Sequence, residues 1–274
     1  MNTDVNDMPI GVFDSGVGGL TVLKALHEAL PHEDLVYLGD TARLPYGTKS
    51  PVSIARYASQ ATGQLQQHGI KLLVVACNTA SAVALESLKR DLDPLPVIGV
   101  VEPGASAAAA ACPGGSHLVL ATEATVRLQA YRHALLALDP DCSVDEMACE
   151  LLVALAEEGW SNGPIAESIV RRYLHEREPA ASAPDCVILG CTHFPLLRDT
   201  IAAAFDANVT LVDSASTTAA AASELLNESG IANAQDAAGR VTLLATDGAR
   251  RFARVGGLFL GRDLAAEDVT LVDL

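Results

Sequence analysis

The chain has 274 residues, enough for about two domains of typical size, and its 50% apolar and 19% charged residues are typical of a folded globular protein. Lys and Arg total 18 against 34 Asp and Glu, so the net charge of −16 repels polyanions and excludes a general nucleic-acid binder. No apolar run reaches the roughly 18 residues of a membrane helix, and the first ten residues contain no Lys or Arg. We therefore expect a cytoplasmic protein with no membrane association.

Strand-like and helix-like segments alternate along the first hundred residues. Turn residues separate them, and a Ser50-Pro51 pair is a typical helix start, with Ser as the N-cap and Pro at the first helical position. The pattern predicts strands at 10–13, 35–38, 70–76 and 97–101, and helices at 20–30, 51 to about 69, and 80–90.

The same alternation continues to the end of the chain. It predicts strands at 118–121, 186–189, 209–212 and 241–245, helices at 124–138, 195–205 and 216–227, and one more helix after residue 245. Repeated strand–helix units predict an α/β fold with mostly parallel sheets covered by helices on both faces. In such folds, binding residues follow the carboxyl ends of strands.

Three strand-plus-turn segments recur at nearly constant spacing, which indicates two similar halves. The paired positions are Cys77 and Cys191, 114 residues apart, Asp14 and Thr122, 108 apart, and Glu102 and Asp213, 111 apart. Because Glu102 and Asp213 follow strands that could lead from one half to the other, we expect one domain of residues 1–101 and 213–274 and a second of 102–212. This arrangement predicts two cysteines that face one cleft.

Cys77 and Cys191 each follow a buried strand and precede a helix. The positive end of a helix favours a thiolate there, and His193 lies two residues from Cys191 as a proton-transfer partner. A single cysteine in this position is more often a packed core residue, but the repeated arrangement favours a reactive pair.

Cofactor and metal motifs are missing from the sequence. The glycines at 16, 18 and 19 do not match the dinucleotide fingerprint because position 21 is Thr, and no phosphate-binding loop pattern occurs. The six cysteines form no CxxC pair, and the four lysines all lie before residue 90, which disfavours zinc and pyridoxal phosphate. We therefore expect a mechanism with no metal and no cofactor.

Six segments together resemble the aspartate/glutamate racemase superfamily. They are FDSGVGGL (13–20), GDTARLPYG (39–47), ACNTAS (76–81), EPG (102–104), LGCTHFPLL (189–197) and LVDSA (211–215). The resemblance implies two pseudo-symmetric α/β domains with the active site in the cleft between them. It also implies pyridoxal-independent interconversion of L- and D-glutamate, which supplies D-glutamate for peptidoglycan.

The resemblance also implies the roles of individual residues. Cys77 and Cys191 would be the catalytic acid and base, with Asp14 assisting Cys77, and with His193 and a Glu of the LAEEG helix assisting Cys191. We favour Glu157 for that Glu, with Glu158 as the alternative. The implied substrate contacts are Asp14, Ser15, Tyr46, Gly47, Asn78, Thr79, Thr192 and His193. The chain departs from the family pattern at Glu150, where Pro is expected, and at Phe194, where Tyr is commoner.

Two cysteines suit this reaction because one base cannot reach both faces of Cα. One thiolate would remove the proton and the opposite thiol would return one. A free Cys has a pKa of about 8.5, and we expect the helix ends and His193 to bring both thiols into the working range.

Several alternatives stay open on the sequence alone. Within the family, the substrate could be aspartate or a hydantoin instead of glutamate. A gyrase-binding protein is an alternative of another class, and a thiol oxidoreductase or acyl-transferring Cys/His enzyme is a third. The expected partners are a small-molecule substrate and a second copy in a homodimer.

Overall fold

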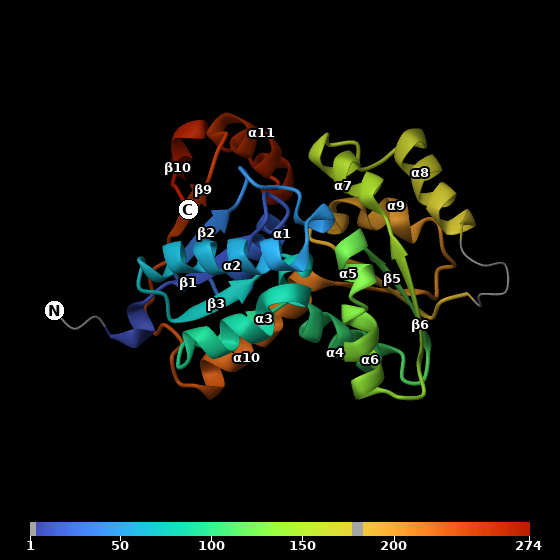
Figure 1. The fold of residues 1–274 in the computed structure, drawn as a ribbon, viewed down its shortest axis with the longest axis horizontal. Coiled ribbons are helices and arrows are strands. Elements are labelled where there is room, and N and C mark those ends of the chain that lie inside the picture. Colours follow the sequence, from blue (N-terminus) through green and yellow to red (C-terminus); the bar gives the residue numbers. More distant parts are fainter. Residues whose placement is uncertain (1–3, 177–182) are drawn as a thin grey trace.

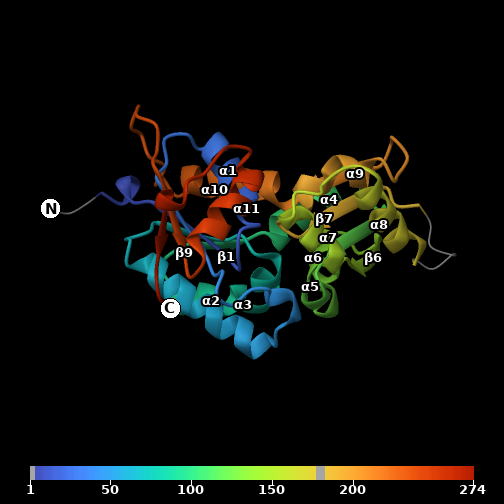
Figure 2. The ribbon, with the colours of Figure 1, turned by 90° about the horizontal axis from the view of Figure 1, so that it is seen from above.

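The strands of the protein form two parallel sheets that lie side by side (Figure 1). The structure is a computed structural model that describes residues 4–176 and 183–274. Helices pack on both faces of each sheet (Figure 2). The predicted α/β class with parallel sheets is confirmed.

The larger sheet has six strands in the order β10-β9-β2-β1-β3-β4, and all its pairings are parallel. Its central strands are entirely buried, as expected for a parallel sheet covered on both faces. The strands are β1 (Ile10–Asp14), β2 (Leu35–Gly39), β3 (Leu72–Val75), β4 (Val97–Gly99), β9 (Val241–Ala245) and β10 (Val269–Leu271).

The smaller sheet has four strands in the order β6-β5-β7-β8, again all parallel. The strands are β5 (Ser116–Ala121), β6 (Ser143–Ala148), β7 (Cys186–Gly190) and β8 (Thr210–Asp213). This order matches the β2-β1-β3-β4 part of the larger sheet, with β1 equivalent to β5 and β3 to β7. The three repeats found in the sequence therefore lie at the carboxyl ends of equivalent strands.

Helices cover the six-stranded sheet on its two faces, and Figure 2 shows α1, α10 and α11 on one side and α2 and α3 on the other. Val12 and Val74 pack into the cluster with α1, α10 and α11, whereas Phe13 and Val75 pack with α2 and α3. This alternation is the two-residue period of a strand. The helices are α1 (Leu20–Ala29), α2 (Pro51–Gln66), α3 (Asn78–Leu92), α10 (Ser214–Glu228) and α11 (Ala249–Leu260).

The four-stranded sheet carries α4 and α6 on one face and α7, α8 and α9 on the other. The helices are α4 (Val101–Ala111), α5 (Glu123–Arg127), α6 (Ala130–Leu138), α7 (Glu150–Glu157), α8 (Pro164–His175) and α9 (Arg198–Ala202), with a 3-10 turn η3 (Phe194–Leu197) before α9.

The chain passes between the sheets twice, through α4 and through α10. We call the part with β1–β4, β9, β10, α1–α3 and α11 the six-stranded half, and the part with β5–β8, α5–α9 and η3 the four-stranded half. The helix α10 packs against α1 and also against α4, so it joins the halves. The order of the strands along the chain is compatible with the expected boundaries at 101/102 and 212/213. The division into domains itself stays a prediction.

Two expected helices differ from the sequence prediction. The helix expected at 124–138 is divided into α5 and α6, because Gln129 has a left-handed backbone (φ 51°) that interrupts the helical hydrogen bonds. The helix expected at 195–205 begins as the 3-10 turn η3, and Leu197 (φ −97°, ψ 9°) separates it from α9.

The predicted start of the second helix is confirmed. Ser50 is the N-cap of α2, its Oγ accepts a hydrogen bond of 3.3 Å from the Ser53 amide, and Pro51 occupies the first helical position. The helix then runs along the sheet and leaves the preceding loop, with Tyr46 and Gly47, at the cleft between the halves.

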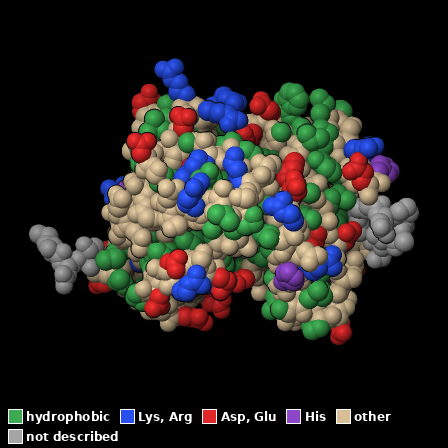
Figure 3. All heavy atoms as spheres, viewed as in Figure 1, with side chains coloured by type: hydrophobic (Ala, Val, Ile, Leu, Met, Phe, Trp, Pro, Cys, Tyr) green, Lys and Arg blue, Asp and Glu red, His purple; other side chains and the backbone are tan. Residues whose placement is uncertain are grey.

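The surface is mixed in charge. On the face seen in Figure 3, Asp and Glu side chains alternate with Lys and Arg, and hydrophobic groups lie between them. No helix among residues 4–176 and 183–274 has the length and apolar character needed to cross a membrane.

Candidate active site

A small cavity lies where the carboxyl ends of the two sheets meet, and both halves of the molecule line it. Its volume is about 40 Å³. The six-stranded half contributes Ser15, Pro45, Tyr46, Gly47, Cys77, Asn78 and Thr79, and the four-stranded half contributes Thr122, Glu150, Val153, Cys191, Thr192 and His193. The two cysteines follow the equivalent strands β3 and β7, so the fold brings them to one cavity as the repeat predicts.

Cys77 is the N-cap of α3 and is 5% exposed. Its Sγ accepts a hydrogen bond of 3.4 Å from the Ala80 amide and donates one of 3.4 Å to Ser15 Oγ. Burial, with the negative charge of Asp14, raises its pKa to about 12 despite these hydrogen bonds. The Ala80 amide lowers the pKa of Cys77, but burial raises it more, so the helix end does not bring this thiol into the expected working range.

Cys191 belongs to a chain of polar contacts on the opposite wall. Its Sγ lies 3.7 Å from His193 Nδ1, and His193 Nε2 lies 3.2 Å from Glu157 Oε1. Burial by itself lowers the pKa of His193, but the contacts with Cys191 and Glu157 raise it to about 10. The same contact with His193 lowers the pKa of Glu157, against the opposing effect of burial. Glu158 is exposed at the end of α7, so the geometry selects Glu157 over Glu158 as the partner of His193.

Asp14 lies behind the cavity at the end of β1 and is completely buried. Its Oδ2 accepts a hydrogen bond of 2.9 Å from the Gly16 amide, and its Oδ1 has no hydrogen-bond partner among the described residues. Burial raises the pKa of Asp14, while the charge of His193 lowers it. Asp14 therefore acts on both Cys77 and His193 through its charge.

The turn after β1 brings the two halves into contact. A Cβ atom at Gly18 would lie 2.4 Å from both His193 Nδ1 and Thr192 Oγ1, so only glycine fits there. Thr21 Oγ1 donates a hydrogen bond of 3.0 Å to the Thr192 carbonyl across the same contact. Gly18, one of the glycines that do not match the dinucleotide fingerprint, thus allows the two halves to approach closely.

Tyr46 lines the cavity, but its hydroxyl has a partner elsewhere. Its side chain is buried, and its hydroxyl donates a hydrogen bond of 2.5 Å to Asp40 Oδ2, which is not part of the cavity wall. Burial and the Asp40 charge raise the pKa of Tyr46 far above its usual value. Tyr46 therefore fixes the shape of the loop, and its phenol is engaged away from the cavity.

The other expected substrate contacts line the cavity with hydroxyls and amides. Asn78 Oδ1 accepts a hydrogen bond of 2.7 Å from Tyr131, and Thr79 Oγ1 lies 2.9 Å from Thr122 Oγ1 in the other half. Thr192 lies next to His193, with 3.5 Å between Thr192 Oγ1 and His193 Nδ1.

The sequence analysis missed several residues of the site. Thr122 follows β5 in the position equivalent to Ser15, one residue from the match with Asp14 that the sequence suggests, and this repeat is a signal that could have placed Thr122 in the site. Glu150 lines the cavity, and its Oε1 accepts a hydrogen bond of 2.6 Å from the Glu123 amide. Arg251, on α11, lies outside the cavity wall, and its Nη2 donates a hydrogen bond of 2.7 Å to Glu157 Oε2.

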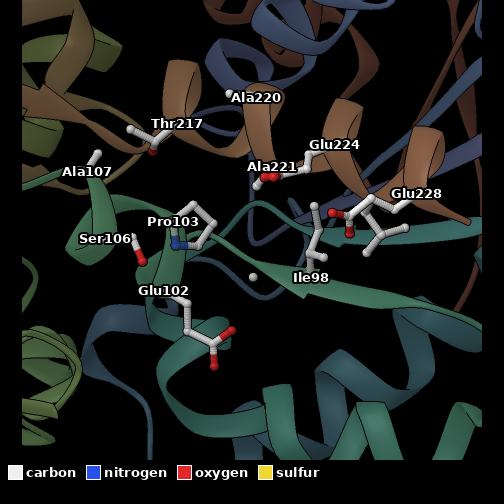
Figure 4. A pocket seen from close by; sticks show the side chains of 12 residues that line it. Ile98, Glu102, Pro103, Ser106, Ala107, Thr217, Ala220, Ala221, Glu224 and Glu228 are labelled. Carbon is white, nitrogen blue, oxygen red and sulfur yellow. The ribbon is translucent and has the colours of Figure 1, made fainter. Parts of the chain in front are cut away.

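A larger groove elsewhere has fewer side chains that could take part in proton transfer. A groove of about 700 Å³ lies between β4, α4 and α10, with the carboxylates of Glu102, Glu224 and Glu228 around it (Figure 4). No cysteine or histidine lines this groove. Within the described part of the chain, no cluster of three or more His, Cys, Asp or Glu side chains has an arrangement that could hold a metal ion.

Comparisons with known proteins agree with this geometry. The family model for Asp/Glu/Hydantoin racemase matches residues 10–222. The glutamate racemase of Geobacter metallireducens is 47% identical, over 97% of this chain and 96% of that protein.

Solved structures give the same result. The glutamate racemase of Thermus thermophilus in complex with β-chloro-D-alanine has a TM-score of 0.87 and 41% identity, with 99% of each chain covered. That of Francisella tularensis in complex with D-glutamate has a TM-score of 0.88 and 34% identity, with 98% of each chain covered. Because the family model and the relatives cover most of its length, the chain belongs to the Asp/Glu/Hydantoin racemase family.

Proposed function

We propose that this protein interconverts L- and D-glutamate by moving protons at Cα between two thiols, those of Cys77 and Cys191. The observation that carries the proposal is that the two cysteines line one cavity from equivalent strand ends in the two halves. Relatives that are 40–47% identical over nearly the whole chain are glutamate racemases, which favours glutamate over aspartate or hydantoin.

The reaction conserves protons and needs no redox step. A thiolate forms an S–H bond as the Cα–H bond breaks, and the electron pair stays on Cα and spreads into the α-carboxylate. The opposite thiol then gives its proton to the other face of Cα and becomes the thiolate. Each catalytic cycle therefore exchanges the roles of the two cysteines, and the opposite enantiomer restores them.

The protonation of the free site differs between the two walls. The His193 imidazolium lies 3.7 Å from Cys191 Sγ and stabilises negative charge there, whereas Cys77, with a pKa of about 12, stays a thiol at neutral pH. Cys191 thus has a cationic neighbour on its wall of the cavity. When Cys77 must be the thiolate, Asp14 is suited to hold a proton, since burial raises its pKa and a neutral Asp14 no longer opposes charge on Cys77.

The substrate carboxylates would bind hydroxyls and backbone amides. Ser15, Thr79 and Thr192 offer hydroxyls, and dipoles of this kind stabilise developing charge in a site without bulk water. The cavity lies between the two halves, so we expect the halves to separate as glutamate enters and to close over it.

The setting of the reaction is part of the proposal. We expect a cytoplasmic homodimer that supplies D-glutamate for peptidoglycan, and light scattering of the purified protein tests the dimer. A topoisomerase pull-down tests the alternative of a gyrase-binding role.

The experiment that tests the activity follows the Cα proton and the chirality together. Reduced protein without cofactor is incubated in D₂O with L-glutamate or L-aspartate, and proton NMR follows Cα–H while circular dichroism follows the enantiomer. We expect the glutamate signal to disappear as the amino acid inverts, with aspartate unchanged. Inversion of aspartate alone would contradict glutamate as the substrate.

Cysteine variants separate the two-base mechanism from a single-thiol mechanism. Cys77→Ser and Cys191→Ser should each lower kcat at least about 100-fold, since each removes one proton-transfer group. Cys142→Ser is the control, because Cys142 is a buried cysteine outside the cavity. Full inversion by either cavity variant would contradict the mechanism, and loss in only one would favour a thiol oxidoreductase or an acyl-transferring enzyme.

A further inference from the structure

The helix α11 belongs to the six-stranded half, yet it contacts His193 and Glu157 of the four-stranded half. Arg251 Nη2 lies 2.7 Å from Glu157 Oε2 on α7. Near the other end of α11, the Phe259 ring meets the His193 ring edge-on, with 5.2 Å between centroids and 84° between planes. Two contacts of one helix therefore reach the His193–Glu157 pair.

The Glu157 carboxylate is held from both sides. Its Oε1 faces His193 Nε2 at 3.2 Å and its Oε2 faces Arg251 at 2.7 Å. A carboxylate with a charged partner on each oxygen has its rotation fixed, since charge-assisted hydrogen bonds are short and directional. Arg251 thus ends a chain of contacts that begins at Cys191 and runs through His193 and Glu157.

The Arg251–Glu157 pair joins the two halves. Arg251 follows β9 of the six-stranded sheet, and Glu157 ends α7 on the four-stranded sheet. The cavity is lined by residues of both halves, so a separation of the halves that admits the substrate would also pull this pair apart. The side chain of Arg251 is 52% exposed, so its partner in the open state would be water.

We propose that Arg251 is a positioning residue that couples closure of the two halves to the orientation of His193. The inference rests on the proposed racemase function and deepens it. In the closed state Arg251 holds Glu157 against His193, and His193 in turn is held beside Cys191. In the open state Glu157 is released from Arg251, and the Cys191 wall loses its fixed geometry until the substrate is enclosed.

Steady-state kinetics of Arg251→Gln test the proposal. We expect KM for glutamate to rise about three- to tenfold, because the closed state is less populated. We expect kcat to fall about ten- to a hundredfold, because His193 is less well oriented. Arg251→Lys should recover most of kcat, since an ammonium group can still pair with Glu157 Oε2, and a melting temperature near that of the wild type would exclude a folding defect.

Arg254→Gln is the matched control. Arg254 is exposed three residues further along α11 and has no ion pair within residues 4–176 and 183–274. Wild-type kinetics in Arg251→Gln would overturn the proposal, as would a fall in kcat alone that Arg251→Lys does not rescue.

Hydrogen exchange of the free protein gives a readout that does not depend on activity. Peptides that cover 191–197 and 249–260 should exchange faster in Arg251→Gln than in the wild type or in Arg254→Gln. Equal exchange would overturn the coupling even if the wild type is active. If the wild type fails to racemise glutamate while exchange still changes in Arg251→Gln, the proposed function is wrong and the closure contact stands.

Discussion

His193 carries a charge in a place where burial alone would remove it. The residue is 8% exposed, and desolvation lowers its pKa, yet the contacts with Cys191 and Glu157 raise the pKa to about 10 from an ordinary value of 6.5. The imidazolium therefore depends on its neighbours for its stability at neutral pH. This makes the folded state sensitive to pH through one residue.

Stability should fall as the pH rises from 6.5 to about 10. A pKa that is higher in the folded state gives a contribution that is complete below the unfolded pKa and is lost as pH rises through the folded one. Glu157→Gln removes one cause of the shift. Over this pH range the unfolding free energy of Glu157→Gln should therefore fall by at least about 1 kcal/mol less than that of the wild type, where one pKa unit corresponds to about 1.4 kcal/mol. Urea unfolding at several pH values measures this.

The exposed neighbour provides the control for that measurement. Glu158→Gln removes the same charge one residue away, outside contact with His193, and should keep the wild-type slope. If Glu157→Gln and the wild type lose stability equally between pH 6.5 and 10, the assignment of the shift to Glu157 fails.

Which residues line the cavity can be predicted from the sequence more readily than their pKa values and hydrogen-bond partners. Motifs and repeats bring Cys77, Cys191 and His193 to the cavity, because position after a strand is readable in a sequence. The burial that sets the pKa of Cys77 and the turn of the Tyr46 hydroxyl to Asp40 depend on the packed structure. The Arg251–Glu157 contact joins residues 94 positions apart, and no local pattern records it.

Among the elements, the turn between β1 and α1 sets how closely the halves approach. Gly18 lies against Thr192 and His193, and a Cβ at Gly19 would lie 2.5 Å from Asp14 Cβ. Both positions place backbone where any side chain would displace a cavity residue. At this turn, only backbone atoms separate the two halves.

Gly18→Ala should abolish most activity while the protein still folds. The added methyl group overlaps His193 Nδ1 and Thr192 Oγ1, so the closed site cannot form, and we expect a loss of kcat/KM of about 100-fold or more. Gly63→Ala is the control: Gly63 lies within α2 with open space at its Cβ position, and Ala should stabilise the helix by about 1 kcal/mol. Near-normal activity of Gly18→Ala would show that the halves need not approach this closely.

Elements with a strong apolar pattern are predictable here, and those at edges are not. The buried strands β2, β3 and β7 are continuous apolar runs, and β1 is one up to Asp14 at its end. The edge strand β6 has no fully buried residue, so its sequence has no apolar signal, and β10 has only three residues. The break between α5 and α6 falls at Gln129, with no Gly or Pro to indicate it.

At the scale of the whole molecule, one hydrophobic core extends through both halves. A single cluster of buried residues contains Val12 of the six-stranded sheet, Leu189 of the four-stranded sheet and Leu226 of α10. The sequence predicts two similar halves from its repeats, but a shared core depends on how α4 and α10 pack between them. This is the part of the architecture that the repeat pattern does not contain.

The two halves should therefore unfold together. Calorimetry should show one transition with calorimetric and van't Hoff enthalpies nearly equal, as for a single cooperative unit. Leu226→Ala, at a completely buried site, should lower the unfolding free energy by about 2–5 kcal/mol and keep one transition. Two separate transitions, or an effect of Leu226→Ala on only one of them, would contradict the shared core.

The position of β9 and α11 in the chain has a consequence for synthesis. The strand β9 pairs with β2, near the start of the chain, and α11 then reaches the Glu157–His193 pair. Until residue 245 or so has left the ribosome, β2 has an unpaired edge, and until residue 260 or so His193 and Glu157 lack their contacts with α11, although both cysteines are already outside. The nascent chain thus passes through a long interval with the edge of β2 open to other strands, in which chaperones would have their main opportunity to act.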